Sequence, residues 1–173
     1  MENPITNYEP ITDAKIDYIE AQVLKNFEFR LETMKILSEQ AMVTLNWLFA
    51  LALTPAGYVF SHADKIKWWI SIPAILCSLA SGLTAIYLFQ KALRTKSIFP
   101  AGNEPKNLIS DAIMAADFRC VRLAELCNLQ GRIETVSKLN VNTANSINNA
   151  RMAIIFITVA SLFLLGLLYC ISA

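Results

Sequence analysis

A stretch of ten residues toward the C-terminal end, residues 140–149 (NVNTANSINN), contains five asparagines and no charge. Asparagine is a mediocre helix former because its amide competes for nearby backbone groups, so its repeated use indicates a need for polarity without charge. Two roles remain open for Asn140, Thr143 and Ile147. They could line a water-filled neck where copies of a helix meet, since neutral polar rings pass ions with little selection by sign. Alternatively, a buried asparagine could set the register and copy number of associated helices.

Three arginines form a second candidate site, because Arg30, Arg119 and Arg122 fall on or beside the apolar faces of two polar segments. They could form a switchable polar interface or bind an anionic ligand. Salt bridges at the rim of a helix contact are the commoner arrangement and contribute little stability. The carboxylates available as counter-charges are Glu20, Glu28, Glu32 and Glu125.

No arrangement of residues supports catalysis. The sequence lacks a P-loop and a dinucleotide-binding glycine pattern, and its single histidine, His62, leaves no place for a His-based triad. No cysteine lies near His62 in sequence, which disfavours a metal site. We therefore predict no enzyme activity, no catalytic residue, no cofactor and no metal. The net charge is +1 and acids are interleaved with bases, so we expect no nucleic-acid partner.

Three uncharged stretches explain how a chain that is 55% hydrophobic can also be 17% charged: Met42–Phe60, Trp68–Phe89 and Met152–Ala173. A helix of about 20 apolar residues spans the roughly 30 Å of bilayer hydrocarbon. The sequence therefore predicts an all-α integral membrane protein with three transmembrane helices. Residues 42–90 should form a two-span hairpin, and residues 152–173 a third span.

Two polar segments make up most of the chain outside the three uncharged stretches. Residues 1–41 should hold an irregular tail and an amphipathic helix beginning near Thr12 or Asp13, because apolar residues recur at steps of three and four. Residues 91–151 should hold a loop and a long helix from about Lys106, with Gly131 as its one weak point. A heptad-like stripe runs along this helix through Leu126, Leu129, Ile133, Val136, Asn140, Thr143, Ile147 and Ala150.

Special residues within the spans predict how they bend and pack. Pro55 and Pro73 should kink the first and second spans, because proline removes a backbone donor. Asn46 could hydrogen-bond to a neighbouring helix or lie near the interface. Small side chains let helices approach closely in lipid, and the second span offers Ser78, Ser81, Gly82 and Ala85 for such packing.

Basic residues near the span ends predict the orientation, because cytoplasmic loops are rich in Lys and Arg. One side has only Lys65 and Lys67, and no basic residue follows the third span. We therefore expect the N-terminus in the cytoplasm, the C-terminus outside, and the spans in the plasma membrane. The basic residues on the predicted cytoplasmic side are Lys35, Lys91, Arg94, Lys96, Lys106 and Arg151.

The order of segments resembles a known family. A polar helix containing LETMK (31–35) leads into a first span containing WLFA (47–50), a second span at 68–89 and a further polar helix. This outline, over roughly residues 15–130, resembles the SLATT-type two-span membrane effectors of bacterial conflict systems. The resemblance implies pore-forming spans that act in a nucleotide-signalled or phage-triggered response. The third span departs from the two-span plan.

Two classes of function fit these features. The first is a homo-oligomeric membrane effector that forms or gates a pore, or perturbs the inner membrane, in anti-phage defence. The alternative is a membrane-anchored inhibitor, such as an immunity or superinfection-exclusion factor, or a structural subunit of a membrane complex without a conducting path. The partners expected for the effector are further copies of itself, the lipid bilayer, and a cytoplasmic sensor protein or signal.

Overall fold

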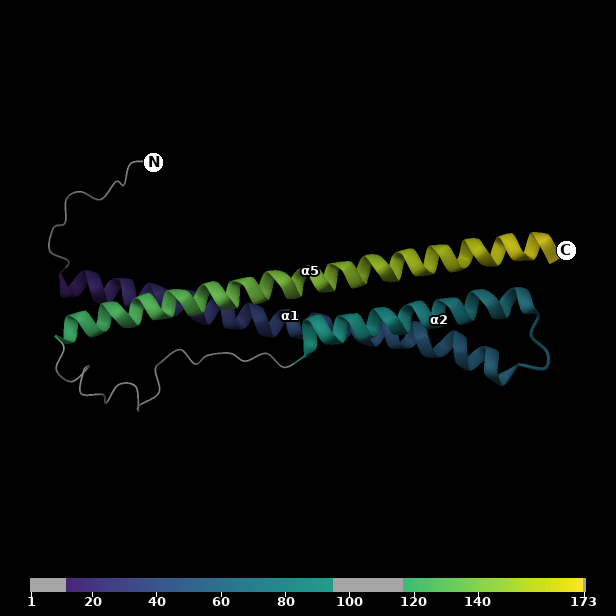
Figure 1. The fold of residues 1–173 in the computed structure, drawn as a ribbon, viewed down its shortest axis with the longest axis horizontal. Coiled ribbons are helices and arrows are strands. Elements are labelled where there is room, and N and C mark those ends of the chain that lie inside the picture. Colours follow the sequence, from purple (N-terminus) through teal and green to yellow (C-terminus); the bar gives the residue numbers. More distant parts are fainter. Residues whose placement is uncertain (1–11, 95–116, 173) are drawn as a thin grey trace. The chain divides into compact units, whose positions relative to one another are not determined.

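The computed structural model describes residues 12–94 and 117–172, and within these ranges it contains helices and no strand. The elements are α1 (Asp13–Ser61), α2 (Trp68–Leu88), the π-helix η1 (Phe89–Leu93) and α5 (Phe118–Ser172) (Figure 1). Three helices are long and apolar enough to cross a membrane. The predicted all-helical fold with three such helices is therefore confirmed. The predicted tail (1–11) and the loop around 99–105 lie outside the described residues.

The chain divides into two compact units, which we describe separately. Residues 1–33 and 97–138 form the first, called the polar unit below. Residues 34–96 and 139–173 form the second, called the membrane unit because it contains all three uncharged stretches. Helices α1 and α5 each contribute to both units, whereas α2 belongs to the membrane unit alone.

Short polar residues begin the two long helices. The helix α1 begins at Asp13, as expected. The backbone N–H of Lys15 donates to Thr12 Oγ1 at 3.4 Å, so Thr12 caps this helix. The N–H of Arg119 donates to the carboxylate of Asp117 at 3.4 Å, and Asp117 is not helical. The long helix of this segment therefore begins at Phe118 in the described residues, and its predicted start near Lys106 lies outside them.

Both proline-containing spans remain helical along their length. Helix α1 continues through Pro55, and α2 continues through Pro73. The predicted kinks at these two residues stay predictions. Helix α5 likewise passes Gly131 without interruption, so it forms one helix rather than two.

The polar unit is a pair of parallel helices. Asp13 near the start of α1 lies by Arg119 near the start of α5, and Arg30 further along α1 contacts Ser137 further along α5. Because both contacts advance in the same direction, the two segments run parallel. The buried side chains between them are Ile16, Phe27, Leu129, Ile133 and Val136.

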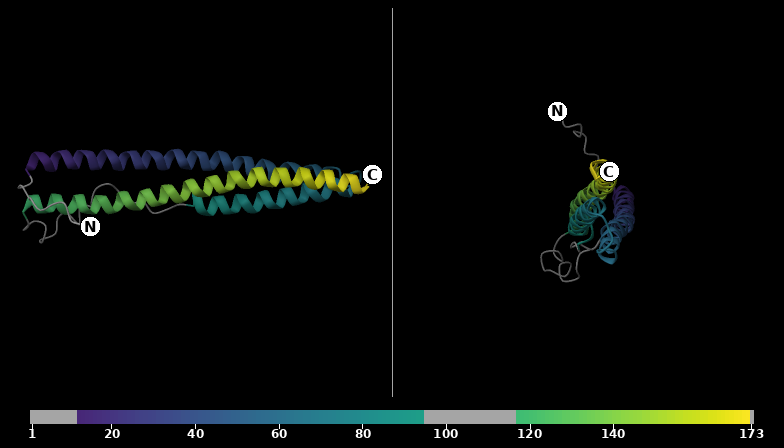
Figure 2. Two further views of the ribbon diagram at one scale, coloured as in Figure 1. Left: turned by 90° about the horizontal axis from the view of Figure 1, so that it is seen from above. Right: turned by 90° about the vertical axis from the view of Figure 1, so that its right-hand side faces the viewer.

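Three helices pack side by side in the membrane unit (Figures 1 and 2). Helix α2 runs antiparallel to α5, because Trp69 contacts Tyr169 at 5.3 Å between ring centroids, while Leu88 at the other end packs with Ile147. The core of this unit joins all three helices and comprises Ala41, Leu45, Leu48, Ala85, Leu88, Ile147 and Ala150.

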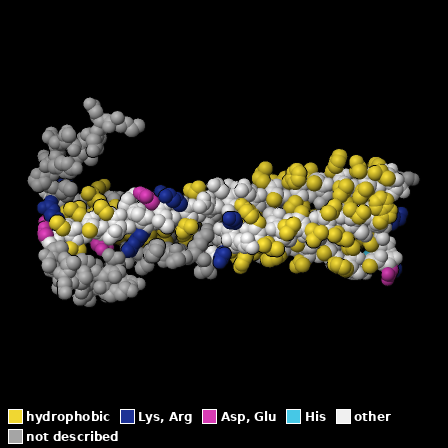
Figure 3. Space-filling view, viewed as in Figure 1, with side chains coloured by type: hydrophobic (Ala, Val, Ile, Leu, Met, Phe, Trp, Pro, Cys, Tyr) yellow, Lys and Arg dark blue, Asp and Glu magenta, His cyan; other side chains and the backbone are white. Residues whose placement is uncertain are grey.

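The outer surface of the membrane unit is apolar. Large hydrophobic side chains cover the visible face of this unit, and the charged ones gather at its ends (Figure 3). An apolar exterior is what a helical unit presents to lipid, where the surrounding medium is as apolar as its side chains. The most exposed of these residues include Phe60, Leu53, Leu83, Phe156 and Phe163.

Candidate functional site

The predicted neck residues lie on the inner side of α5. The exposed fraction is 6% for Asn140, 8% for Thr143 and 1% for Ile147. Ile147 belongs to the core shared with α1 and α2, so its side chain faces helices of its own chain. Both the neck and the register-setting role of this segment stay predictions. A neck made of these residues would require α5 to change its packing partners.

Ser146 joins this buried polar set, although the sequence reasoning did not select it. Its side chain is 7% exposed, and its hydroxyl donates to the carbonyl oxygen of Asn142 at 2.8 Å. This back-bond satisfies the hydroxyl within its own helix. A step of three residues from Asn140 through Thr143 to Ser146 was the signal that could have identified it.

The four small residues of α2 that were predicted to pack differ in burial. Ser81 is fully buried and Ala85 is 2% exposed, whereas Ser78 and Gly82 are half-buried. Ser78 donates its hydroxyl to the carbonyl oxygen of Ala74 at 3.0 Å. Buried residues of α2 recur every four positions at Pro73, Cys77, Ser81 and Ala85. Of these, Pro73 and Cys77 were not among the residues predicted for packing.

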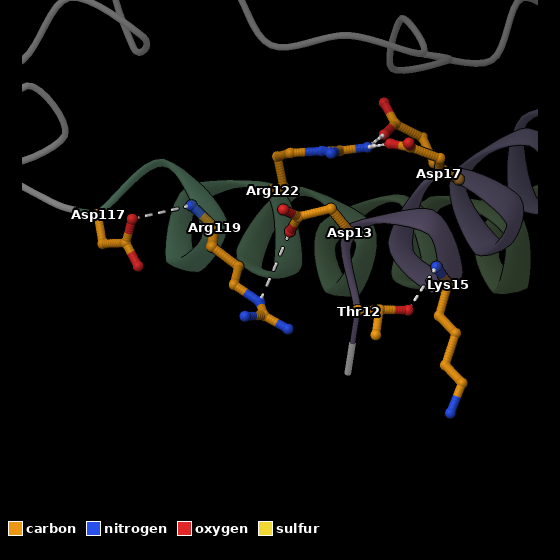
Figure 4. Close-up of polar contacts among 8 residues, drawn as sticks. Thr12, Asp13, Lys15, Asp17, Asp117, Arg119 and Arg122 are labelled. Atoms are coloured by element: carbon orange, nitrogen blue, oxygen red, sulfur yellow. Dashed lines mark hydrogen bonds and ion pairs between the residues drawn. The ribbon is translucent and has the colours of Figure 1, made fainter. Parts of the chain in front are cut away.

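Arg122 is the centre of a charged contact in the polar unit (Figure 4). One of its guanidinium nitrogens lies 2.5 Å from a carboxylate oxygen of Asp17 and 2.5 Å from one of Glu20. Both carboxylates come from α1, so a single α5 side chain bridges two successive turns of the partner helix. Glu20 was among the predicted counter-charges. Asp17 was not, because its proximity depends on the register between the helices.

The other two predicted arginines extend this contact along the helix pair. Arg119 lies 4.0 Å from Asp13 (Figure 4). Arg30 donates to the hydroxyl of Ser137 at 3.3 Å and to the side-chain oxygen of Asn26 at 3.4 Å. All three arginines therefore have side-chain partners within the polar unit, and each makes at least one contact between α1 and α5.

The electrostatic setting of Arg122 favours its charged form. Hydrogen bonds to Glu20 and then to Asp17 raise its pKa above the ordinary arginine value. The side chain is 22% exposed, and the two carboxylates are 65% and 43% exposed. Because solvent screens such exposed charges, the contact adds little stability.

The described residues offer no group of three or more His, Cys, Asp or Glu side chains that could hold a metal ion. The four cysteines are free, with Cys77 buried and Cys120, Cys127 and Cys170 exposed.

Comparisons with protein-family models, curated proteins and solved structures yield no match to this chain.

Proposed function

We propose that this chain is a homo-oligomeric effector of the bacterial inner membrane, with its N-terminus in the cytoplasm. A signal or sensor protein acts on the polar unit, and the spans then form or gate a pore or otherwise perturb the membrane. The biological setting of the proposal is anti-phage defence, which is what the resemblance in segment order implies.

The observation that carries this proposal is the exposed amide of Asn46. This residue lies inside the uncharged stretch Met42–Phe60, and its side chain is exposed on α1. Among the described residues it has no hydrogen-bond partner. An amide facing lipid is costly unless it finds a partner, and an asparagine can both donate to and accept from the same residue of a second copy. Association of copies would satisfy Asn46 in this way.

The continuity of two helices supports a response to a cytoplasmic signal. Helices α1 and α5 each begin among the charged residues of the polar unit and end in an uncharged stretch without a break. The contacts of Arg122, Arg119 and Arg30 hold these helices in register within the polar unit. A partner that shifts this register would alter the same helices that cross the membrane.

One observation favours the alternative, in which the chain is a membrane-anchored inhibitor or a structural subunit. Asn140, Thr143 and Ile147 are already buried within a single chain. Such packing needs no central axis and no conducting path. Under the effector proposal, this arrangement is the closed form, and opening must turn these residues of α5 toward other copies.

Counting the chains in a purified assembly tests the oligomer. We expect native mass spectrometry in lipid nanodiscs to show a closed ring of several copies. Asn46→Leu should weaken association by about 0.6 to 2 kcal/mol per contact, or roughly three- to thirty-fold in the association constant. Asn148→Leu, the same change at an exposed amide outside the uncharged stretches, is the matched control. A monomer under all conditions would reject the effector.

Membrane potential tests the pore. We expect triggered cells or proteoliposomes to depolarise, and Asn140→Leu or Thr143→Leu to change the conductance while Asn148→Leu leaves it unaltered. An assembly that never conducts would favour the inhibitor or structural subunit. Unchanged conductance in both variants of a conducting protein would remove Asn140 and Thr143 from the path.

A further inference from the structure

A polar hollow lies in the membrane unit between the end of α2 and the Asn-rich segment of α5. Its volume is about 540 Å³. On one side it is lined by Tyr87, Gln90 and Lys91, and on the other mainly by Asn142, Asn145 and Asn149. These asparagines are not the predicted neck residues. They occupy the outer side of the same helix, and the proposed function assigns them no role.

The chemistry of the lining suits a phosphate that carries hydroxyl groups. Four lining residues are amides, which donate and accept hydrogen bonds, and Lys91 supplies a positive charge. No lining residue is acidic. Among the residues that the structure describes, Lys91 makes no ion pair, and its side chain is exposed.

The hollow lies at the depth where a lipid headgroup would be. Two of the uncharged stretches begin at Met42 and Met152, just beyond Gln40 and Arg151, whose side chains hydrogen-bond at 3.5 Å. Gln90 and Lys91 lie two and three residues after Leu88, which packs in the same core as Ala41 and Ala150. The lining residues therefore sit where all three spans leave the uncharged region, which is the polar boundary of a bilayer.

Backbone geometry distinguishes this end of α2 from a simple helix terminus. Gln90 and Lys91 belong to the π-helix Phe89–Leu93, and the N–H of Arg94 donates to the carbonyl oxygen of Phe89 at 2.8 Å. A π-turn re-aims side chains relative to an α-helix and is frequent at functional sites. Here it directs two polar side chains into the hollow opposite the amides of α5.

A second hollow of about 520 Å³ shares one lining residue, Gln90, with the first. Its lining is mostly apolar, with Phe49, Ile86 and Phe89 beside the cation of Arg94. A polar hollow next to an apolar one matches a molecule with a polar head and an acyl chain, which a soluble phosphate lacks.

We propose that the polar hollow binds the headgroup of an anionic phospholipid of the phosphatidylglycerol type. Lys91 pairs with the phosphate, and Asn142, Asn145, Asn149 and Gln90 hydrogen-bond to the headgroup oxygens. Basic pockets between membrane helices on the cytoplasmic side recognise anionic headgroups in this way. The inference uses contacts within one chain and does not depend on pore formation or oligomer number.

The test measures binding to the full chain purified in detergent. Titrated phosphatidylglycerol should raise the thermal unfolding midpoint, and native mass spectrometry should show it bound. Phosphatidylcholine, which has no net charge, and soluble glycerol 3-phosphate should do neither at the same concentrations. Lys91→Gln should weaken phosphatidylglycerol binding roughly ten-fold or more, since a charge-assisted hydrogen bond is lost.

Asn145→Leu should weaken binding as well, by a smaller factor. Matched controls are Lys67→Gln, a lysine at the opposite end of α2, and Asn148→Leu, which does not line the hollow. Circular dichroism establishes that each variant is helical. Equal binding of the two lipids, or unchanged binding in Lys91→Gln, would overturn the proposal. Binding of glycerol 3-phosphate as tight as that of the lipid would show that the ligand is soluble and would overturn the lipid assignment.

Discussion

The second and third spans of this chain are alike in sequence but differ in how they pack. Both are long and uncharged, and α5 contains the most apolar stretch of the three membrane helices. Helix α2 nevertheless buries five of its residues, whereas none of the most apolar stretch of α5 is buried. Apolar character therefore does not decide which span packs tightly within its own chain.

Side-chain size explains the difference. The inner face of α2 carries Cys77, Ser81 and Ala85, which let neighbouring backbones approach closely. The half-buried face of α5 beyond Met152 carries mainly bulky residues. An apolar side chain gains little free energy when it moves from lipid into a helix contact, because lipid tails are equally apolar. Close packing rather than hydrophobicity therefore drives the association of helices in a membrane. The bulky half-buried residues of α5 are Ile154, Ile157, Leu164, Leu165 and Leu168.

Removing a core side chain should give the largest effect. Leu88→Ala in the fully buried core of the membrane unit should cost about 2–5 kcal/mol, toward the low end because lipid rather than water receives the exposed surface. Leu162→Ala on α5, where the side chain is 63% exposed, should cost almost nothing. Reversible unfolding in mixed micelles, followed by circular dichroism, measures both. Equal losses would mean that the third span packs as tightly as the second.

Enlarging a small residue should have the next largest effect. Ala85 is 2% exposed, so Ala85→Leu should overpack the contact of α2 and lower stability by about 1–3 kcal/mol. Ala160→Leu makes the same change on the exposed surface of α5 and should be tolerated. The same unfolding measurement applies. If Ala85→Leu left stability unchanged, close packing at the small residues of α2 could not explain why α2 is more buried than the third span.

The aromatic contact between the two spans should contribute less. Trp69 and Tyr169 meet edge to face at 5.3 Å between centroids, near the end of the unit opposite η1. A double-mutant cycle with Trp69→Leu and Tyr169→Leu should give a coupling of about 0.5–1.5 kcal/mol. A coupling near zero would mean that this end of the third span makes no measurable stabilising contact with α2.

The smallest effect on this comparison is expected from the polar unit. Arg122→Gln removes the bridge to Asp17 and Glu20 but should leave the contrast between α2 and α5 unchanged, because neither span loses a contact. Folding raises the pKa of Arg122. Its contribution to the free energy of unfolding is therefore fully present below the pKa of the unfolded chain, and is lost only as pH rises through the pKa of the folded chain. Arg122 should therefore contribute no pH dependence between about pH 6 and pH 9. The difference in free energy of unfolding between wild type and Arg122→Gln should be constant in this range. A difference that varies with pH would contradict the raised pKa of Arg122.

Local pattern was sufficient for much of the fold. Runs without charge predicted three long apolar helices, since any charged residue would be costly in lipid. The heptad-like stripe of α5 predicted most of the side chains that turn inward: Leu129, Ile133, Val136, Asn140, Thr143, Ile147 and Ala150 are all buried. Leu126, the first residue of the stripe, is only half-buried. Periodicity identifies a face because the helical repeat fixes where each side chain points.

The same sequence left the partners of those faces undecided. It placed arginines beside carboxylates but did not show that Arg122 meets Asp17 together with Glu20, because that pairing depends on two segments more than 100 residues apart running parallel in one register. It also did not separate the buried Ser81 from the half-buried Ser78, or reveal that Asn46 faces outward.

The amino-acid sequence by itself determined that the chain is helical, where the uncharged spans lie, and which stripe of α5 is inward-facing, because these follow from composition and from the helical period. Only the tertiary structure decided which helices share a core, how closely each span packs, and that a hollow forms where α2 ends beside the asparagines of α5. Those features arise from contacts between residues distant in the chain, and local sequence carries no record of the register that brings them together.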